Sequence, residues 1–333
     1  MLATLHTIDR RTLLSGLLAS LATPICAVWA QSSGPAVVGF LNMNTREASG
    51  HLLTALREGL AELGLKDGTQ LVIEERWADN RFERLDALAA ELAARRPAVI
   101  VAGPSQVVRA VVKAAPTVAI VHATGADPVA AGFAASLGRP GGMVTGLANS
   151  MTDVSEKYLE FLLLAVPALR RVGFMTDSTN VARARIAELA RQSIERAGIG
   201  GSVAEVSAPG EIDAAVARLA RDGAQALVLM PSPLFLGERR RILAQAQARR
   251  WPVAAPLKEF AEDGALLSYG HDVSLNFRRA AYYVDRILKG ARPADLPIEQ
   301  PLKLELVVNM KTARSLGIAL APAILVRADR VIE

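Results

Sequence analysis

The sequence predicts an α/β protein with two doubly wound lobes, each built on a parallel β-sheet, joined by a three-strand hinge. Short β-rich apolar runs alternate with amphipathic helical stretches almost from end to end, as in a parallel sheet with helices on both faces. This alternation pauses in a Gly- and Pro-rich stretch, residues 125–146, and then restarts. With 333 residues, the chain is long enough for two lobes that each bury a core.

The first half opens with an apolar strand and an amphipathic helix. Leucines recur at three- and four-residue spacing between Leu52 and Leu63, and Gly64 closes this helix. In this half, strands are expected at residues 37–41, 71–77, 99–102 and 118–122, with further helices around residues 82–92 and after Ser105.

The second half repeats this rhythm. Strands are expected at residues 171–175, 203–206, 226–230, 253–255, 266–269 and 305–308, and helices at 152–165, 181–196, 211–221, 237–249, 275–288 and 312–316. The late elements return to the first lobe and then to the second, which gives three crossovers. The predicted lobes are residues 35–148 plus 272–300, and residues 149–271 plus 301–333. Such a hinge is suited to closure around a ligand.

The first thirty residues are typical of a signal peptide. Arg10-Arg11 precede an apolar run ending in Val28-Trp29-Ala30, and the small residues near its end fit cleavage after Ala30. The segment predicts export to the periplasm and leaves the general and twin-arginine routes open. The single cysteine, Cys26, lies inside it, so the exported chain has no thiol for a disulfide or for catalysis. Beyond it, no stretch reaches the roughly 18 apolar residues that a membrane span needs.

Charge and motifs favour binding over catalysis or nucleic-acid recognition. The net charge is +5, and Arg239-Arg240-Arg241 has no interleaved aromatics, so we interpret it as solvated helix surface. Adjacent Glu74 and Glu75 point to opposite faces of a strand and make no acid pair. Nucleophile-elbow, phosphate-loop, dinucleotide-binding and zinc-protease motifs are absent from the sequence. The four histidines are far apart, so we expect no metal site and no cofactor.

Candidate ligand-binding residues follow the predicted strands, because open parallel sheets bind ligands at the carboxyl ends of their strands. The polar residues in these positions are Asn42, Asn44, Ser105, Gln106, Thr124, Asp127, Ser178, Thr179, Asn180, Ser232, Tyr269 and Asp272.

Some of these residues have two interpretations. Hydroxyls at a helix start, such as Ser105 and Ser178-Thr179, lie beside free N–H groups and suit a carboxylate. The same residues are also ordinary helix caps. Phe40, Phe235 and Tyr269 are candidates to hold a ring-bearing ligand, or else they belong to the core.

Several separated motifs resemble those of one family. Gly125-Ala126-Asp127-Pro128-Val129 and Arg139-Pro140-Gly141-Gly142-Met143-Val144-Thr145-Gly146 are similar to the Gly-Asp-Pro-Val and Arg-Pro-Gly-Gly-Asn-Val-Thr-Gly segments of the ABC transporter substrate-binding family that includes tryptophan- and tyrosine-binding members. Residues 278–290, 293–301 and 327–333 are similarly close, so the likeness spans essentially the whole exported chain.

This resemblance implies a type I periplasmic-binding fold that holds a small molecule between its lobes and delivers it to a membrane permease and its ATPase. The protein would then be a monomer that meets the membrane only through the permease and binds no nucleic acid. Carried over by position, the residues facing the cleft are Asn42, Ser105, Thr124, Asp127, Ser178, Asn180, Ser232 and Tyr269.

The chain departs from the family where a ligand would be chosen. Its turns read Ser105-Gln106-Val107, Asp177-Ser178-Thr179-Asn180 and Pro231-Ser232-Pro233, so the ligand is not carried over. Our hypothesis is an amino acid or another small carboxylate, aromatic or branched. The alternatives are a periplasmic sensor that signals to a membrane receptor, and an exported α/β enzyme.

Overall fold

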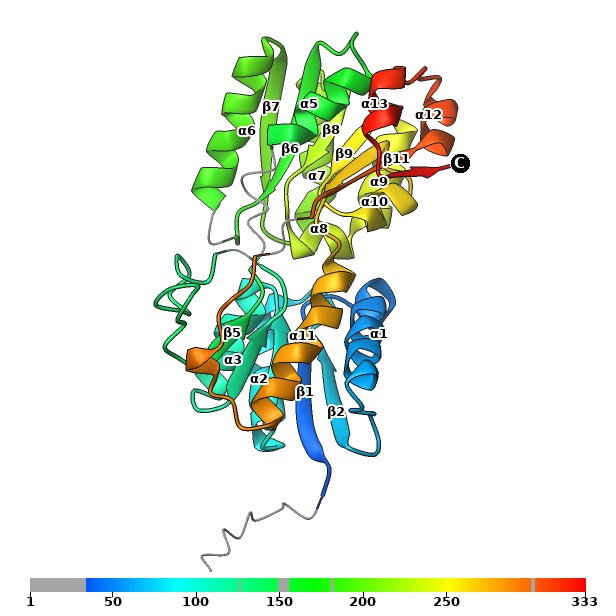
Figure 1. Cartoon of the computed structure of the whole chain (residues 1–333). Coiled ribbons are helices and arrows are strands. Elements are labelled where there is room, and N and C mark those ends of the chain that lie inside the picture. Colours follow the sequence, from blue (N-terminus) through cyan, green and yellow to red (C-terminus); the bar gives the residue numbers. More distant parts are fainter. Residues whose placement is uncertain (1–33, 126, 149–155, 181–182, 301–302) are drawn as a thin grey trace, which may run out of the picture. The chain divides into compact units, whose positions relative to one another are not determined.

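Two β-sheets organise the computed structural model (Figure 1), which describes residues 34–125, 127–148, 156–180, 183–300 and 303–333. The predicted signal peptide lies outside the described residues. Within the described part, no helix is long and apolar enough to cross a membrane.

The first sheet has five parallel strands in the order β2-β1-β3-β4-β5. They are β1 (Ala36–Asn42), β2 (Leu71–Trp77), β3 (Val99–Gly103), β4 (Ala119–His122) and β5 (Val144–Gly146). The sequence did not predict β5, because its three residues lie in the Gly- and Pro-rich stretch.

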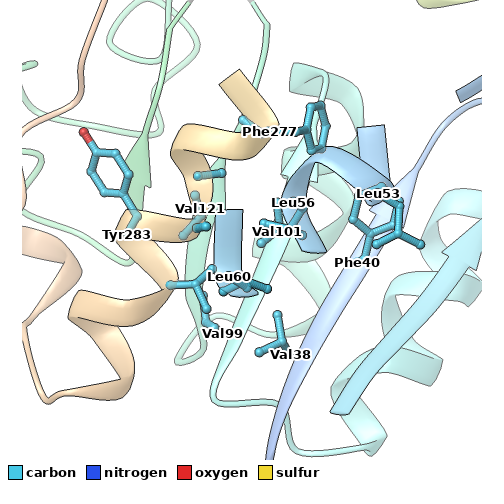
Figure 2. Close-up of a cluster of buried hydrophobic side chains, with 14 of the residues drawn as sticks. Val38, Phe40, Leu53, Leu56, Leu60, Val99, Val101, Val121, Phe277 and Tyr283 are labelled. Atoms are coloured by element: carbon cyan, nitrogen blue, oxygen red, sulfur yellow. The ribbon is translucent and has the colours of Figure 1, made fainter. Parts of the chain in front are cut away.

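Helices cover both faces of this sheet. They are α1 (Arg46–Glu62), the 3₁₀ turn η1 (Phe82–Arg84), α2 (Leu85–Ala94), α3 (Ser105–Ala114), α11 (Val273–Leu288) and the 3₁₀ turn η3 (Pro293–Asp295). Residues of α1 and α11 pack with Val38, Phe40 and Val101 in one core (Figure 2), while α2 and α3 pack against Ile100 and Leu41 on the other face. Because successive side chains point to opposite faces of a strand, the strands of this sheet contribute residues to two cores.

The second sheet has seven strands in the order β12-β11-β10-β9-β8-β6-β7, and only the β10–β11 pair is antiparallel. They are β6 (Arg171–Asp177), β7 (Gly200–Val206), β8 (Leu227–Leu229), β9 (Val253–Ala255), β10 (Leu267–Gly270), β11 (Glu305–Asn309) and β12 (Arg330–Ile332).

Helices again pack on both faces and build two further cores. They are α5 (Glu156–Ala165), α6 (Arg183–Ala197), the 3₁₀ turn η2 (Pro209–Glu211), α7 (Ile212–Arg221), α8 (Pro233–Gly237), α9 (Arg239–Ala248), α10 (Lys258–Glu262), α12 (Met310–Leu316) and α13 (Pro322–Arg327). The expected helix at 237–249 corresponds to α9, whereas the short helix α8, which ends just before Glu238, was not predicted. The short elements α10, α13 and β12 were not predicted.

The chain changes sheets after β5, after β10 and before β11. The segments after β5 and before β11 run side by side: Leu147 and Glu299 form a parallel bridge, and the Ala148 N–H donates to the Glu299 carbonyl at 2.9 Å. The residue boundaries of the two lobes stay a prediction, since residues 149–155 and 301–302 lie outside the described residues. Below, the first and second lobes are the two sheets with their helices.

Candidate ligand-binding site

A pocket of about 130 Å³, called the inner pocket here, lies where the carboxyl ends of strands from both sheets meet. Its first-lobe lining comes from the loops after β1, β3 and β4, with Leu52 of α1 and Val273 of α11. Its second-lobe lining comes from the loops after β6, β8 and β9, with Ile186 of α6. The lining residues are Asn42, Asn44, Leu52, Gly103, Pro104, Ser105, Gln106, Thr124, Gly125, Asn180, Ile186, Pro231, Ser232, Pro233, Leu236, Pro256, Leu257 and Val273.

None of the described lining residues carries a charge. Aliphatic side chains and prolines make most of the wall, and the polar groups are amides and hydroxyls. An apolar cavity of about 150 Å³ is large enough to admit benzene, so a ring-sized group fits this space. The aliphatic lining residues were not predicted, because an apolar side chain on a helix face is indistinguishable in sequence from one in a core.

Asn44 connects the two lobes. Its Nδ2 donates to Oδ1 of Asn80 at 2.9 Å and to the carbonyl of Pro233 in the second lobe at 2.8 Å, while its Oδ1 accepts from Ser49 Oγ at 3.2 Å. The backbone N–H of Asn44 donates to Oδ1 of Asn42 at 3.0 Å. Contacts within the protein therefore use both donors of the Asn44 amide.

The first-lobe floor of the pocket needs a glycine. Gly125 has φ of +144°, and a Cβ there would lie 2.5 Å from His122 Nε2 and 2.8 Å from Ser105 Oγ. His122 is fully buried beneath this point. Burial lowers its pKa to about 4, against a smaller opposing effect of the Thr124 backbone, so the ring is neutral at neutral pH.

The second-lobe side is organised by Asp177, a buried residue at the end of β6. Its Oδ1 accepts from Thr179 N at 2.8 Å and from Thr179 Oγ1 at 2.6 Å, and its Oδ2 accepts from Ser232 Oγ at 2.7 Å. Ser232 also caps α8 by accepting from Phe235 N at 3.3 Å. Asp177 thus positions two predicted site residues, although the sequence did not single it out.

Of the predicted site residues, Asn42, Asn44, Ser105, Gln106, Thr124, Asn180 and Ser232 line the inner pocket. Thr179 lines a neighbouring pocket instead. Outside both pockets, Ser178 Oγ donates to the Val206 carbonyl at 3.4 Å, and Asp127 accepts from Val129 N at 2.8 Å within a turn.

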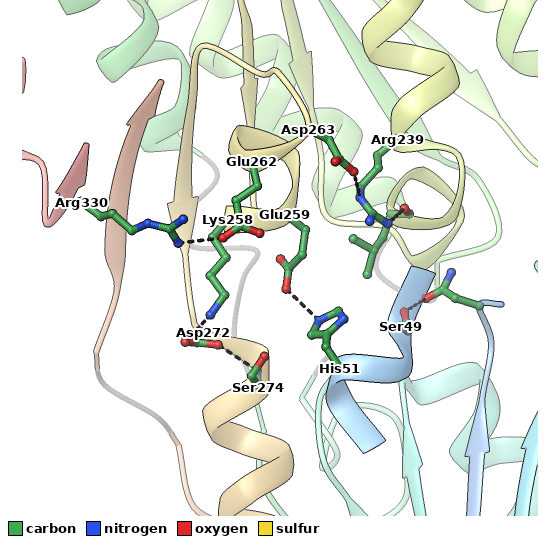
Figure 3. A network of polar contacts seen from close by, with 12 residues as sticks. Ser49, His51, Arg239, Lys258, Glu259, Glu262, Asp263, Asp272, Ser274 and Arg330 are labelled. Carbon is green, nitrogen blue, oxygen red and sulfur yellow. Dashed lines mark hydrogen bonds and ion pairs between the residues drawn. The ribbon is translucent and has the colours of Figure 1, made fainter. Parts of the chain in front are cut away.

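Two further candidates are held by packing or capping. The Tyr269 ring lies edge-on to Phe161, with centroids 4.9 Å apart. Asp272 caps α11 and pairs with Lys258 Nζ at 2.6 Å (Figure 3). The other aromatic candidates, Phe40 and Phe235, are fully buried in the cores.

Further contacts join the lobes beside the inner pocket. His51 Nε2 in α1 lies 3.1 Å from Glu259 Oε1 in α10 (Figure 3), and Arg240 of α9 donates to Glu47 of α1 at 2.7 Å. Gly237 packs so closely on Asn80 that a Cβ on it would lie 2.2 Å from the Asn80 Oδ1. These contacts bring the two lobes together around the pocket.

Comparison with known proteins gives concordant matches. A sequence model of the family described as ABC transporter substrate binding protein matches residues 37–332. The chain is 22% identical over 260 residues to a tyrosine-binding protein of Clostridioides difficile strain R20291, covering 78% of this chain and 74% of that protein.

Solved structures are similar over most of the chain. The ABC domain from Streptococcus pneumonia in complex with L-Trp has a TM-score of 0.81 and 22% identity, covering 90% of this chain and 100% of that one. The ligand-free, open structure of a substrate binding protein with adhesive properties from Clostridium difficile has a TM-score of 0.63 and 20% identity, covering 90% and 99%. These likenesses confirm the predicted fold of two α/β lobes with parallel sheets.

Proposed function

Because the chain belongs to the ABC transporter substrate-binding protein family and has a type I periplasmic-binding fold, we propose that it serves an ABC importer. It captures a small molecule between its lobes and hands it unaltered to a membrane permease and its ATPase. The observation that carries this proposal is the uncharged inner pocket, which is lined from the strand ends of both sheets.

The proposed ligand is an amino acid with an aromatic or branched side chain, or another small carboxylate. A tyrosine-binding relative and a structural relative in complex with L-Trp support this class. The size and aliphatic wall of the inner pocket support it independently, because they suit a single ring or a branched chain.

Binding is proposed to shift an equilibrium between open and closed lobes. The structure is more similar to the relative in complex with L-Trp than to the ligand-free, open relative. The bond between Asn44 and the Pro233 carbonyl is the kind of interlobe contact that a closed form adds.

The remaining proposals concern the place and mode of action. We propose that residues 1–30 direct export to the periplasm, and that the protein acts there as a monomer. The described lining of the inner pocket has no acidic, basic or histidine side chain to act as a general acid or base, which supports transport without chemistry.

A thermal-shift and calorimetric screen tests this function. The panel holds amino acids, organic acids, sugars and simple cations, and each bound compound is recovered and identified by mass spectrometry. We expect an amino acid or small carboxylate at a concentration of 100 Kd to stabilise the folded protein by about 2.7 kcal/mol. This stabilisation raises the melting temperature. Heat with sugars or cations only, or recovery of an altered compound, would contradict the proposal.

A further inference from the structure

We propose that the ligand lies across two adjoining pockets, with its ring in the inner pocket and its anionic group at the guanidinium of Arg109. The second pocket, called the outer pocket here, is lined by Asn80, Arg81, Phe82, Glu83, Gln106, Arg109, Thr179, Ser207, Ala208 and Pro209. This inference rests on the proposed function and deepens it, because it assigns an orientation to the ligand and a residue to its charge.

The inner pocket is a poor place for a carboxylate. Its described lining offers no cation. A carboxylate buried there would lose its hydration and gain no charged partner in return. On the second-lobe side, the hydroxyls of Thr179 and Ser232 already donate to Asp177. The side chain nearest to these hydroxyls is thus an acid, which disfavours a second anion there.

Ser178, which the sequence predicts as a carboxylate-binding residue at the start of α6, is also directed elsewhere. Ser178 directs its hydroxyl to the Val206 carbonyl, at the end of the edge strand β7. The second-lobe hydroxyls of Ser178, Thr179 and Ser232 are therefore already committed to acceptors within the protein.

The inner pocket is also too small for a whole aromatic amino acid. Its volume of about 130 Å³ matches a ring, so the polar end of such a ligand extends beyond it. Gln106 lines both pockets and marks where they adjoin. The outer pocket is wider, about 800 Å³, and has room for the remaining atoms.

Arg109 supplies the charge in the outer pocket. It follows Gln106 by three residues in α3, so the two side chains share one face of the helix. Its guanidinium lies over the Phe133 ring, 5.5 Å from the centroid, and makes no ion pair with any residue that the structure describes. The other outer-pocket cation, Arg81, already has Glu83 beside it at 3.9 Å. Arg109 is therefore the better partner for an added carboxylate.

The test compares a carboxylate with its neutral amide. Wild-type protein and Arg109→Gln are titrated by calorimetry with L-tryptophan, L-tyrosine and indole-3-acetate, and with the carboxamide of each. Arg221→Gln is the matched control, because it removes the same charge from an exposed site at the end of α7 that lines neither pocket. Circular dichroism and the melting temperature establish that each variant is folded.

We expect Arg109→Gln to weaken binding of a carboxylate about 2- to 5-fold, because Arg109 is exposed and solvent screens an ion pair there. Binding of its carboxamide, already weaker in the wild type, should be the same in both proteins. Arg221→Gln should bind every probe as the wild type does.

Two results overturn the orientation while leaving the proposed function intact: unchanged carboxylate binding by Arg109→Gln, or an equal loss for carboxylate and carboxamide. If the wild type binds no carboxylate in the panel, this inference fails, and the aromatic part of the proposed ligand class fails with it.

Discussion

His51 Nε2 in α1 lies 3.1 Å from Oε1 of Glu259 in α10, and this contact joins the first lobe to the second. Glu259 is only 7% exposed, so a partner is needed when the lobes are together. The contact is therefore expected to favour the closed arrangement.

His51→Ala should weaken ligand binding about 3- to 10-fold, because a single hydrogen bond contributes about 1 kcal/mol. Calorimetric titration measures this loss. The matched control is Thr54→Ala in the same helix, whose hydroxyl donates to the Gly50 carbonyl one turn earlier. Equal affinities for His51→Ala and wild type would show that this contact does not contribute to closure.

Gly237→Ala should also oppose closure, by steric conflict. The added Cβ would lie 2.2 Å from Asn80 Oδ1, which Asn44 holds in place. We expect weaker binding with little change in melting temperature, since the conflict exists only between lobes. Adding Asn80→Gly removes the opposing side chain at a backbone φ of +61°, which glycine accepts. Failure of this second change to recover affinity would argue against the clash.

Two glycines of α1 should respond in opposite directions. A Cβ on Gly59 would lie 2.4 Å from the carbonyl of Arg278 in α11, so Gly59→Ala should destabilise the fold by about 1–3 kcal/mol. Gly50 has only Arg46 Cγ nearby, at 3.7 Å, so Gly50→Ala should stabilise it by up to about 1 kcal/mol. Urea unfolding measures both changes, and equal effects would contradict the close packing of α1 on α11.

Stability should fall between pH 6.5 and 4 because of His122. Its ordinary pKa of 6.5 is lowered to about 4 in the folded protein, so over this range the unfolded chain binds the extra proton. The contribution of the neutral His122 ring to the free energy of unfolding is complete above pH 6.5. It is lost as the pH falls, by about 3 kcal/mol in total. His122→Asn should flatten the slope of melting temperature against pH in this window and leave it unchanged above pH 7. An unaltered slope would mean that His122 is not the group responsible.

Asp177→Ala should lower both stability and affinity. It leaves Thr179 and Ser232 without their shared acceptor, at a cost of about 1–3 kcal/mol for buried groups that lose a partner. Ser178→Ala is the contrasting variant, because its hydroxyl faces the Val206 carbonyl outside both pockets. Denaturation and titration should find Ser178→Ala close to wild type, and a large loss of affinity there would restore Ser178 to the site.

Most of the fold could be predicted because strong periodicity marks its long elements. The strands β2 and β9 have the predicted ends, whereas β5 and β12, with three residues each, are too short to show alternation. Helix α8 was missed because it has only five residues, too few to show a helical period, and begins at Pro233.

For the candidate site, the sequence could predict which loops contribute but not which side chains within them. The rule that ligands bind at strand ends selected the loops after β1, β3 and β8, which do line the inner pocket. Within a loop, the direction of each side chain depends on local hydrogen bonds. Neighbouring Ser178 and Asn180 illustrate this, since only Asn180 reaches the pocket.

The bridge between Leu147 and Glu299 affects how the lobes can move. Two of the connecting segments are hydrogen-bonded to each other, and Arg279 of α11 anchors Glu299 through bonds of 3.0 and 2.7 Å. A paired ribbon bends more easily than its strands slide along each other, since sliding breaks the pairing. Opening is therefore expected as a swing about a single axis through this ribbon, with translation of one lobe past the other suppressed.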